Sequence, residues 1–122
     1  MKYFTQSHEW LELKDHIGTV GITHYAQAEL GEIVFIELPK VGDKIKASQE
    51  ISVLESTKAA ADVYAPVSGE IISINEALSA KPSLINQAAE GAGWLFKLKL
   101  SHLKELDHLM DEKQYRALVH QQ

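Results

Sequence analysis

Cysteine is absent from this 122-residue sequence, which excludes disulfides, thiolate metal sites and cysteine nucleophiles. Long apolar runs are also missing, because no stretch approaches the roughly 18–20 residues that a membrane-spanning helix requires. An excess of basic residues is lacking as well: twelve Lys and Arg stand against seventeen Asp and Glu, a net charge of −5. An acidic chain is poorly suited to neutralising phosphates, so we expect no nucleic-acid partner, and no membrane partner either.

Targeting signals are equally hard to find at the amino end. Residues 1–10 lack the apolar core of a secretory signal and the Arg/Ser-rich character of an organelle transit peptide. We therefore expect a cytoplasmic protein, or one of the mitochondrial matrix if the sequence is a processed form. The length suits a single core, which usually spans roughly 100–200 residues, so we expect one domain over residues 1–122.

Patterns typical of catalysis are missing too. The sequence has no Gly-rich phosphate loop, nucleophile elbow or paired-carboxylate signature. His102 and His108 are six residues apart, rather than the three or four that place two metal ligands on one helix face. The other histidines are scattered at His8, His16, His24 and His120. We therefore predict no metal site and no intrinsic enzyme activity.

Short apolar runs separated by turn residues fill the middle of the chain, which is the pattern of many short strands. In the last run, Trp94, Phe96, Leu98 and Leu100 are predicted to share one face, with two lysines on the other. The strands are predicted at residues 17–22, 33–38, 51–55, 61–64, 70–74 and 94–100. The pattern therefore predicts a β core over about residues 2–100.

Helical signals are short and lie mostly near the C-terminus, over about residues 101–120. Thr23 can cap an earlier helix over residues 24–30 that ends at Gly31. Ser101 is predicted to cap a stretch whose apolar side comprises Leu103, Leu106, Leu109 and Met110. Asp111 and Gln114 read as a variant capping box. This box would open a second short helix with Tyr115, Leu118 and Val119 on its apolar side.

Lys58 stands between two predicted strands and is surrounded by small residues. A loop lysine is ordinarily a surface charge. Here, residues 41–45 and 68–71 repeat a turn with glycine and an acidic residue before an apolar run, once on each side of Lys58. Two such units around a central hairpin would form a quasi-symmetric sandwich with Lys58 at its tip. This placement suggests a lysine that is displayed for acylation by another enzyme.

At this point the chain resembles a known family, the H protein of the glycine cleavage system, from Tyr3 to about Tyr115. The ordered set of motifs carries the resemblance, because no single motif is specific. The motifs are Ser7–Trp10, Val20–Thr23, Ala26–Gln27, Leu30–Phe35, Glu37–Pro39, Val41–Gly42, Glu55–Ala59, Pro66–Glu70, Asn75–Glu76 and Gly93–Leu95. The resemblance implies a mainly β, lipoyl/biotinyl-domain-like barrel-sandwich hybrid with short helices, mostly C-terminal. The strands and helices read directly from the sequence agree with this fold.

The resemblance further implies that Lys58 carries lipoic acid in amide linkage, which takes the net charge from −5 to −6. The tether keeps the reactive sulfurs at high effective concentration near any enzyme that docks. The implied partners are a pyridoxal-phosphate-dependent glycine decarboxylase (P protein), which loads an aminomethyl group, and a tetrahydrofolate-dependent aminomethyltransferase (T protein), which accepts it. A flavin-dependent dihydrolipoyl dehydrogenase (L protein) reoxidises the arm, and a lipoate ligase or octanoyltransferase attaches it. The chain itself would be a non-catalytic carrier in glycine catabolism and one-carbon metabolism.

In the family, the loaded arm folds into a cleft of the carrier that excludes water. The residues credited with holding its cationic amine match Ser7, Glu9 and Asp62 here. A carboxylate paired with an amine forms a short, charge-assisted hydrogen bond, so these assignments are chemically sensible. Without the resemblance, Ser7 would read as a cap or turn residue and Asp62 as a solvated charge on a strand.

The sequence departs from the family pattern at two places. Thr57 stands where the family usually has Val, a near-isosteric change that we expect the turn beside Lys58 to tolerate. Residues 87–93 (Gln-Ala-Ala-Glu-Gly-Ala-Gly) replace a loop that commonly has Pro-Tyr before the glycine. We expect this loop to help shape the cleft of the arm, and the exchange to loosen it without affecting lipoylation.

Three related carriers are alternatives. Biotin carriers usually have Met on both sides of the lysine, whereas Thr57 and Ala59 flank it here. Lipoyl domains of 2-oxoacid dehydrogenases usually read Asp-Lys-Ala and lie on long chains with Ala/Pro-rich linkers, which are absent here. An H-like relay protein, which donates lipoyl groups to other lipoate-dependent proteins, remains open from the sequence, and the departure at residues 88–89 favours it slightly.

Overall fold

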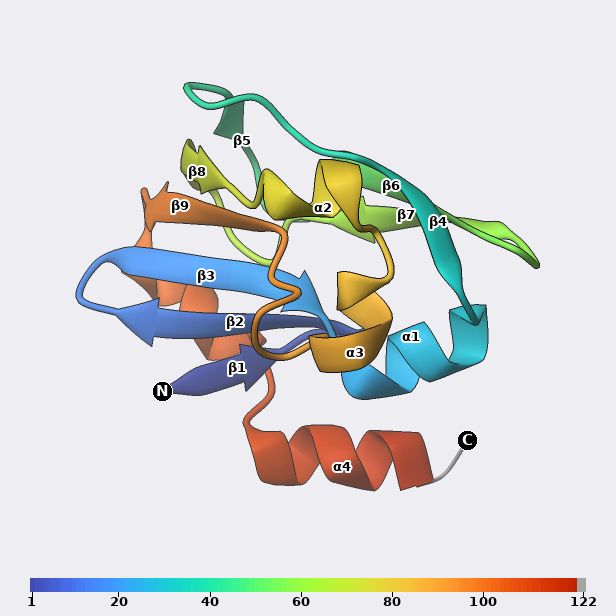
Figure 1. Cartoon of the computed structure of the whole chain (residues 1–122). Helices are drawn as coiled ribbons and strands as arrows, with labels where there is room; N and C mark the ends of the chain where they lie inside the picture. Colours follow the sequence, from blue (N-terminus) through green and yellow to red (C-terminus); the bar gives the residue numbers. More distant parts are fainter. Residues whose placement is uncertain (121–122) are drawn as a thin grey trace.

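Two antiparallel β-sheets face each other in the computed structural model, which describes residues 1–120 (Figure 1). A six-stranded sheet has the order β1-β2-β3-β9-β8-β5, and a three-stranded sheet has the order β4-β6-β7. The strands are β1 (Lys2–Phe4), β2 (Glu9–Lys14), β3 (Ile17–Ile22), β4 (Ile33–Glu37), β5 (Lys44–Ile45), β6 (Glu50–Ser56), β7 (Ala60–Tyr64), β8 (Gly69–Ile74) and β9 (Phe96–Leu100). The predicted mainly β sandwich with short helices is confirmed.

All six predicted strands are present, with ends shifted by at most two residues. The sequence analysis missed β1, β2 and β5. Strand β2 was not predicted because buried and exposed residues do not alternate along it. Trp10 and Leu11 are both almost fully buried, on opposite faces of the sheet. A strand that is covered on both faces lacks the period-2 pattern by which a half-buried strand is recognised.

The two faces of β2 contact two separate apolar clusters. Leu11 belongs to the main core between the sheets, together with residues from both of them. Trp10 belongs to a second cluster with Phe4 and Tyr115, whose rings stack with centroids 4.8 Å apart. Helix α4 (Glu112–His120) supplies Tyr115 and lies beneath β1 and β2, on the side of the large sheet away from β6 and β7 (Figure 1). The C-terminal helix therefore closes the second cluster.

Two predicted helix starts have the expected hydrogen bonds. The Thr23 hydroxyl accepts a hydrogen bond from the Ala26 amide at the start of α1 (His24–Leu30), and Gly31 ends that helix with φ = 85°. Asp111 and Gln114 form the reciprocal box at the start of α4: each side chain accepts a hydrogen bond from the backbone N–H of the other, at 2.8 and 3.0 Å. Both caps follow from local chemistry, which explains why they could be predicted.

Other helical predictions need correction. Residues 103–108 form a 3-10 helix, η1 (Leu103–His108), that begins after His102 without a side-chain cap, so Ser101 does not cap a helix. Trp94 precedes β9 and packs against the second cluster, whereas Phe96, Leu98 and Leu100 lie in the main core. Helices α2 (Ala77–Ala80) and α3 (Leu84–Ala88) were not predicted, because one turn is too short to display helical periodicity.

The two segments of the internal repeat lie side by side. Strand β5 pairs with β8 so that Lys44 is opposite Glu70 and Ile45 is opposite Gly69. The pairing continues into the turn, where the Gly42 amide donates to the Ile71 carbonyl at 2.8 Å. This contact is consistent with two related β units on either side of the β6–β7 hairpin. Within residues 1–120, the structure contains no helix long and apolar enough to span a bilayer.

Gly69 allows β8 to approach β9 closely, and replacing it tests this packing. A Cβ atom at Gly69 would overlap the backbone carbonyl oxygen of Lys99 and lie 2.6 Å from a methyl group of Leu98. We expect Gly69→Ala to lower the free energy of unfolding by at least about 2 kcal/mol, because backbone atoms cannot move aside cheaply. Urea denaturation measures the change. Gly91→Ala is the matched control, since its nearest atom would lie at 3.9 Å, and an equal effect of both variants would contradict this account.

Candidate functional site

Lys58 lies at the tip of the β6–β7 hairpin, in a turn that Ser56 stabilises. The Ser56 hydroxyl accepts hydrogen bonds from the backbone N–H groups of Lys58 at 3.1 Å and Ala59 at 3.0 Å. The Ser56 amide donates to the Ala59 carbonyl at 2.8 Å, closing the turn. These local hydrogen bonds hold the backbone of the turn. The side chain of Lys58 is not involved in them.

The tip is also attached to the end of α1. The Thr57 amide donates to the Glu32 carbonyl at 3.0 Å. The Lys58 side chain extends over Gly31, where a Cβ atom would lie 3.3 Å from Lys58 Cε. Asn86 on α3 holds this segment in place: its amide donates to the Gly31 carbonyl at 2.8 Å, and its oxygen accepts from the Ile33 amide at 2.9 Å. Sequence analysis missed Asn86, because its partners are distant in the chain.

The ammonium group of Lys58 has no ion pair and no hydrogen bond to any of the residues 1–120, and the side chain is exposed. Its neighbours Ala59 and Ala60 are small and exposed as well. A modifying enzyme could therefore reach the amine without displacing a neighbouring side chain.

A cleft of about 350 Å³ opens beside the hairpin, between α1 and β7. It contains all three residues that the sequence analysis proposed as contacts of a loaded arm. Its lining is Ser7, His8, Glu9, Ile22, Tyr25, Ala26, Glu29, Leu30, Leu54, Ala61, Asp62 and Val63. Lys58 does not line the cleft. It lies four residues from Asp62, at most about 14 Å along the hairpin.

Glu9 is the buried acid of the cleft, with 1% of its surface exposed. One carboxylate oxygen accepts hydrogen bonds from the hydroxyls of Thr5 at 2.5 Å and Ser7 at 2.6 Å. The other accepts from the backbone N–H of Tyr64 on β7, at 3.2 Å. Two carboxylate oxygens have about four acceptor positions, so three donors leave Glu9 with capacity for one more.

The remaining lining residues indicate which kind of ligand the cleft could bind. Ile22, Leu30, Leu54 and Val63 supply apolar walls. Asp62 and Glu29 are exposed carboxylates at the rim, and the sequence analysis did not identify Glu29. Apolar walls favour an aliphatic chain, and carboxylates favour a cation at its end. The cleft is therefore chemically matched to a flexible apolar arm that carries an amine.

His8 connects the cleft with α4. Its φ of 71° is uncommon outside glycine, and hydrogen bonding compensates for this conformation. The His8 ring nitrogen Nδ1 and the Tyr115 hydroxyl are 2.7 Å apart, and the same hydroxyl is 2.7 Å from the Thr23 hydroxyl. Burial lowers the pKa of His8, although the carboxylates of Glu9 and Glu29 act in the opposite direction. Neutral His8 can therefore accept a hydrogen bond from the Tyr115 hydroxyl.

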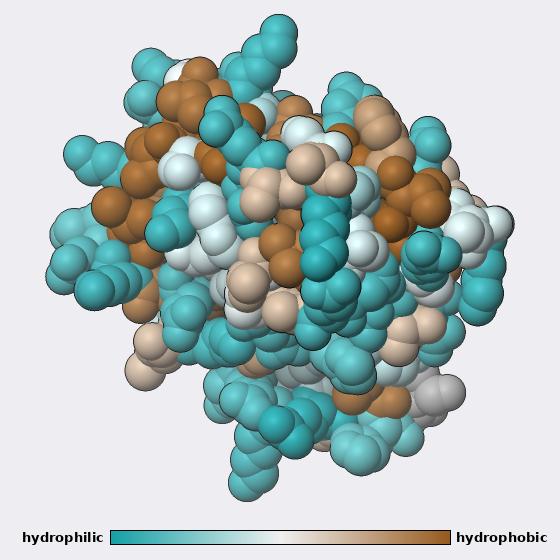
Figure 2. All heavy atoms as spheres, in the orientation of Figure 1, coloured by the Kyte–Doolittle hydropathy of each residue, from teal (hydrophilic) through white to brown (hydrophobic). Residues whose placement is uncertain are grey.

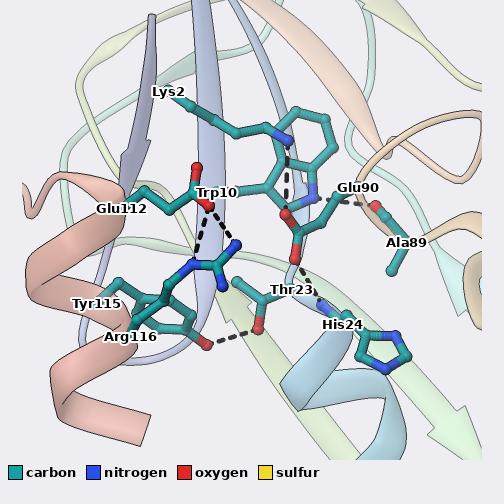
Figure 3. A network of polar contacts seen from close by, with 9 residues as sticks. All are labelled: Lys2, Trp10, Thr23, His24, Ala89, Glu90, Glu112, Tyr115 and Arg116. Carbon is teal, nitrogen blue, oxygen red and sulfur yellow. Dashed lines mark hydrogen bonds and ion pairs between the residues drawn. The ribbon is translucent and has the colours of Figure 1, made fainter.

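The unusual loop at residues 87–93 braces the site from outside (Figure 3). The Trp10 indole donates to the Ala89 carbonyl at 3.0 Å, and the Glu90 carboxylate accepts from the His24 amide at the start of α1, at 2.9 Å. Glu90 also pairs with Lys2 at 3.5 Å. None of residues 87–93 lines the cleft. The loop therefore does not line the cleft itself but supports β2 and α1, which contribute to the walls.

A second cavity, of about 830 Å³, lies on the other side of Glu9 and is bordered by Phe4, His108 and Met110. It shares Ser7 and Glu9 with the first cleft, but none of its lining residues belongs to α1 or the hairpin tip. Residues 1–120 contain no group of three or more His, Asp or Glu side chains arranged to hold a metal ion.

Comparisons with known proteins agree with one another. A family model described as glycine cleavage H-protein matches residues 2–122. The glycine cleavage system H protein of Thermotoga maritima is 48% identical over 122 residues, covering 100% of this chain and 98% of that protein. The protein of the same name from Bartonella tribocorum is 50% identical over 117 residues, covering 96% of both. A crystal structure of a glycine cleavage system H protein from Mycobacterium marinum aligns with a TM-score of 0.88 at 33% identity, over 95% of this chain and 94% of that one.

The lowered pKa of His8 predicts that the folded state loses stability at acidic pH. The folded state binds the His8 proton less readily than the unfolded state, so stability should fall as the pH drops below about 6.5. Asn tolerates the left-handed backbone, so His8→Asn should keep the fold and show a weaker loss. Urea denaturation at pH 7.5, 6.5 and 5.5 measures this difference. His16→Asn, in the exposed β2–β3 turn, should behave like the parent. Identical pH dependence of the parent and His8→Asn would contradict the assignment.

Proposed function

This chain belongs to the glycine cleavage H-protein family, and we propose that it is the lipoyl carrier of the glycine cleavage system. In this role it shuttles the aminomethyl group of glycine on Lys58 from the decarboxylase to the aminomethyltransferase. One observation carries the proposal: an exposed lysine at a hairpin tip, with no ion pair to any of residues 1–120, stands beside a cleft that contains Ser7, Glu9 and Asp62.

The residues present fit a lipoyl group. The Lys58 amine is accessible for amide formation, and the apolar walls beside it suit the hydrocarbon part of the arm. When bound, the group supplies a dithiolane that can accept the aminomethyl unit and be reoxidised after transfer. The proposed partners are glycine decarboxylase, aminomethyltransferase, dihydrolipoyl dehydrogenase and a lipoate ligase or octanoyltransferase.

The carrier contributes orientation and protection. Glu9 has acceptor capacity left beside its three donors, so it can accept one more hydrogen bond from an ammonium group. Ser7 and Asp62 are exposed at the cleft and can complete the coordination of the amine. Holding the amine in its protonated form would remove the nitrogen lone pair that drives cleavage of the neighbouring carbon–sulfur bond, and the apolar walls would limit access of the water that releases ammonia. Both effects slow the loss of ammonia.

The chain is proposed to act as a non-catalytic carrier, with residues 1–122 as one domain. A cytoplasmic location is proposed because the relatives compared above come from bacteria. The family comparisons do not favour the lipoyl-relay alternative. It is kept as an outcome of the reconstitution experiment.

Reconstitution with glycine decarboxylase tests the proposal. Intact-mass analysis of protein made with lipoate available should show a lipoyl-sized increment, and the modified carrier should support exchange of bicarbonate into glycine. Lys58→Arg should lose both, because a guanidinium group does not form the amide. Lys40→Arg, another exposed lysine, is the control and should retain both. A lipoylated parent that supports no exchange would favour the relay role.

The proposed contact between Glu9 and the amine predicts faster decay of the loaded carrier in Glu9→Gln. Loss of one charge-assisted hydrogen bond should speed ammonia release by about tenfold, with lipoylation unchanged. Ammonia release from the isolated, aminomethyl-loaded protein is the measurement, and Glu12→Gln on the exposed side of β2 is the control. Asp62→Asn, which removes a surface charge, should speed decay without disturbing the fold. If both cleft variants lose ammonia at the same rate as the parent, the proposal that the amine binds in this cleft is contradicted.

A further inference from the structure

Two large apolar side chains stand next to each other in solvent on β4. Val34 is 51% exposed and Phe35 is 50% exposed, whereas their neighbours Ile33 and Ile36 are buried in the main core. Successive residues of a regular strand point to opposite faces, so one of the two would normally be covered. A register shift between Ile33 and Phe35 in the pairing with β6 accounts for the double exposure.

This arrangement is unusual for an edge strand. β4 is an outer strand of the three-stranded sheet and has β6 as its only neighbour there. Exposed edges are normally protected by charges, proline or coverage, because an apolar edge promotes association. The bulge in β4 directs Val34 and Phe35 outward together and leaves about half of each side chain exposed. Retained exposure of this kind indicates a surface that contacts another protein.

Carboxylates surround the two side chains. Glu55 on β6 is paired directly opposite Phe35, and Glu32 and Glu37 stand just before and at the end of β4; all three are exposed. Residues 24–39 and 47–57 contain no Lys or Arg. Figure 2 shows the apolar surface over β4 with hydrophilic residues beside it. We call Val34, Phe35, Glu32, Glu37 and Glu55 the β4 patch.

The β4 patch is continuous with the hairpin that displays Lys58. Ile33 is paired with Ser56, two residues before Lys58, and the Glu32 carbonyl accepts from the Thr57 amide. An enzyme that receives the Lys58 arm in its active site must bring its entrance against this tip, and the β4 patch lies beside it. Neither Val34 nor Phe35 lines the cleft, so an enzyme docked on β4 leaves the cleft free to receive the arm as it withdraws.

We propose that the β4 patch is the docking surface for the enzyme that loads the arm, which in the proposed function is glycine decarboxylase. The chemistry of the patch specifies its counterpart: an apolar pocket for Phe35 and Val34, bordered by Lys or Arg side chains that pair with the three carboxylates. Phe35 is the anchor, because buried aromatic side chains dominate such interfaces. The carboxylates accelerate and orient the encounter. The inference rests on the proposed function of Lys58.

Steady-state exchange kinetics with fully lipoylated carrier test this docking surface. Phe35→Thr should raise the KM for the carrier by about tenfold and leave kcat unchanged, because the arm and cleft are untouched. Glu37→Gln should raise KM less and weaken its dependence on salt. Val41→Thr is the matched control: Val41 is 61% exposed but lies in the β4–β5 connection, away from the hairpin. Thermal unfolding and intact mass verify fold and lipoylation of every variant.

The outcomes separate the possible failures. Unchanged KM for both Phe35→Thr and Glu37→Gln would overturn the docking surface while leaving the carrier role intact. Slower lipoylation of Phe35→Thr with an unchanged exchange KM would assign the surface to the attaching enzyme and overturn the proposal. An equal rise in KM for Val41→Thr would show a general effect of surface polarity and also count against it. Absence of exchange with the parent would instead overturn the proposed function, and with it the partner named here.

Discussion

The buried carboxylate of Glu9 is the interaction on which the cleft depends. A carboxylate removed from water is costly unless hydrogen bonds replace its solvation. Here the hydroxyls of Thr5 and Ser7 and the backbone N–H of Tyr64 provide them. Because Glu9 begins β2 in the large sheet and Tyr64 ends β7 in the small one, the same bonds join the two sheets beside the cleft. The acid is thus fixed by these three donors beside a cleft with apolar walls.

A hydrogen-bonded backbone and an exposed side chain are combined at Lys58. The backbone of the tip is held by Ser56 and by the contact between Thr57 and Glu32, while the ammonium group has no partner among the described residues. A carrier needs this combination, since the arm must visit several enzymes from a defined starting point. The cleft walls receive support from further away, through the His8–Tyr115–Thr23 hydrogen bonds and through Glu90 at the start of α1. Helix α4 therefore contributes to the site without lining it.

Local patterns led to correct predictions where local chemistry decides the structure. The caps at Thr23 and at Asp111 with Gln114, and the strands that alternate or end at glycine and proline, fall in this class. Prediction failed where distant residues decide. Strand β2 is covered by the main core on one side and by α4 on the other, so its residues carry no alternation. Trp94 does not lie on the predicted strand face, because it packs against the second cluster, which contains Phe4, Trp10 and Tyr115.

The sequence alone determined the β-rich architecture, the position of Lys58 in a hairpin turn and its similarity to a carrier family, because turn residues, periodicity and ordered motifs are all readable along one dimension. Only the tertiary structure decided which groups meet. Glu9 contacts Tyr64 across 55 positions and His8 contacts Tyr115 across 107, and neither pair is marked by any spacing in the chain. The shift that exposes Val34 and Phe35 together likewise arises from pairing with β6. Burial and hydrogen bonding between distant segments are collective properties of the folded chain, which explains why they had to be seen in three dimensions.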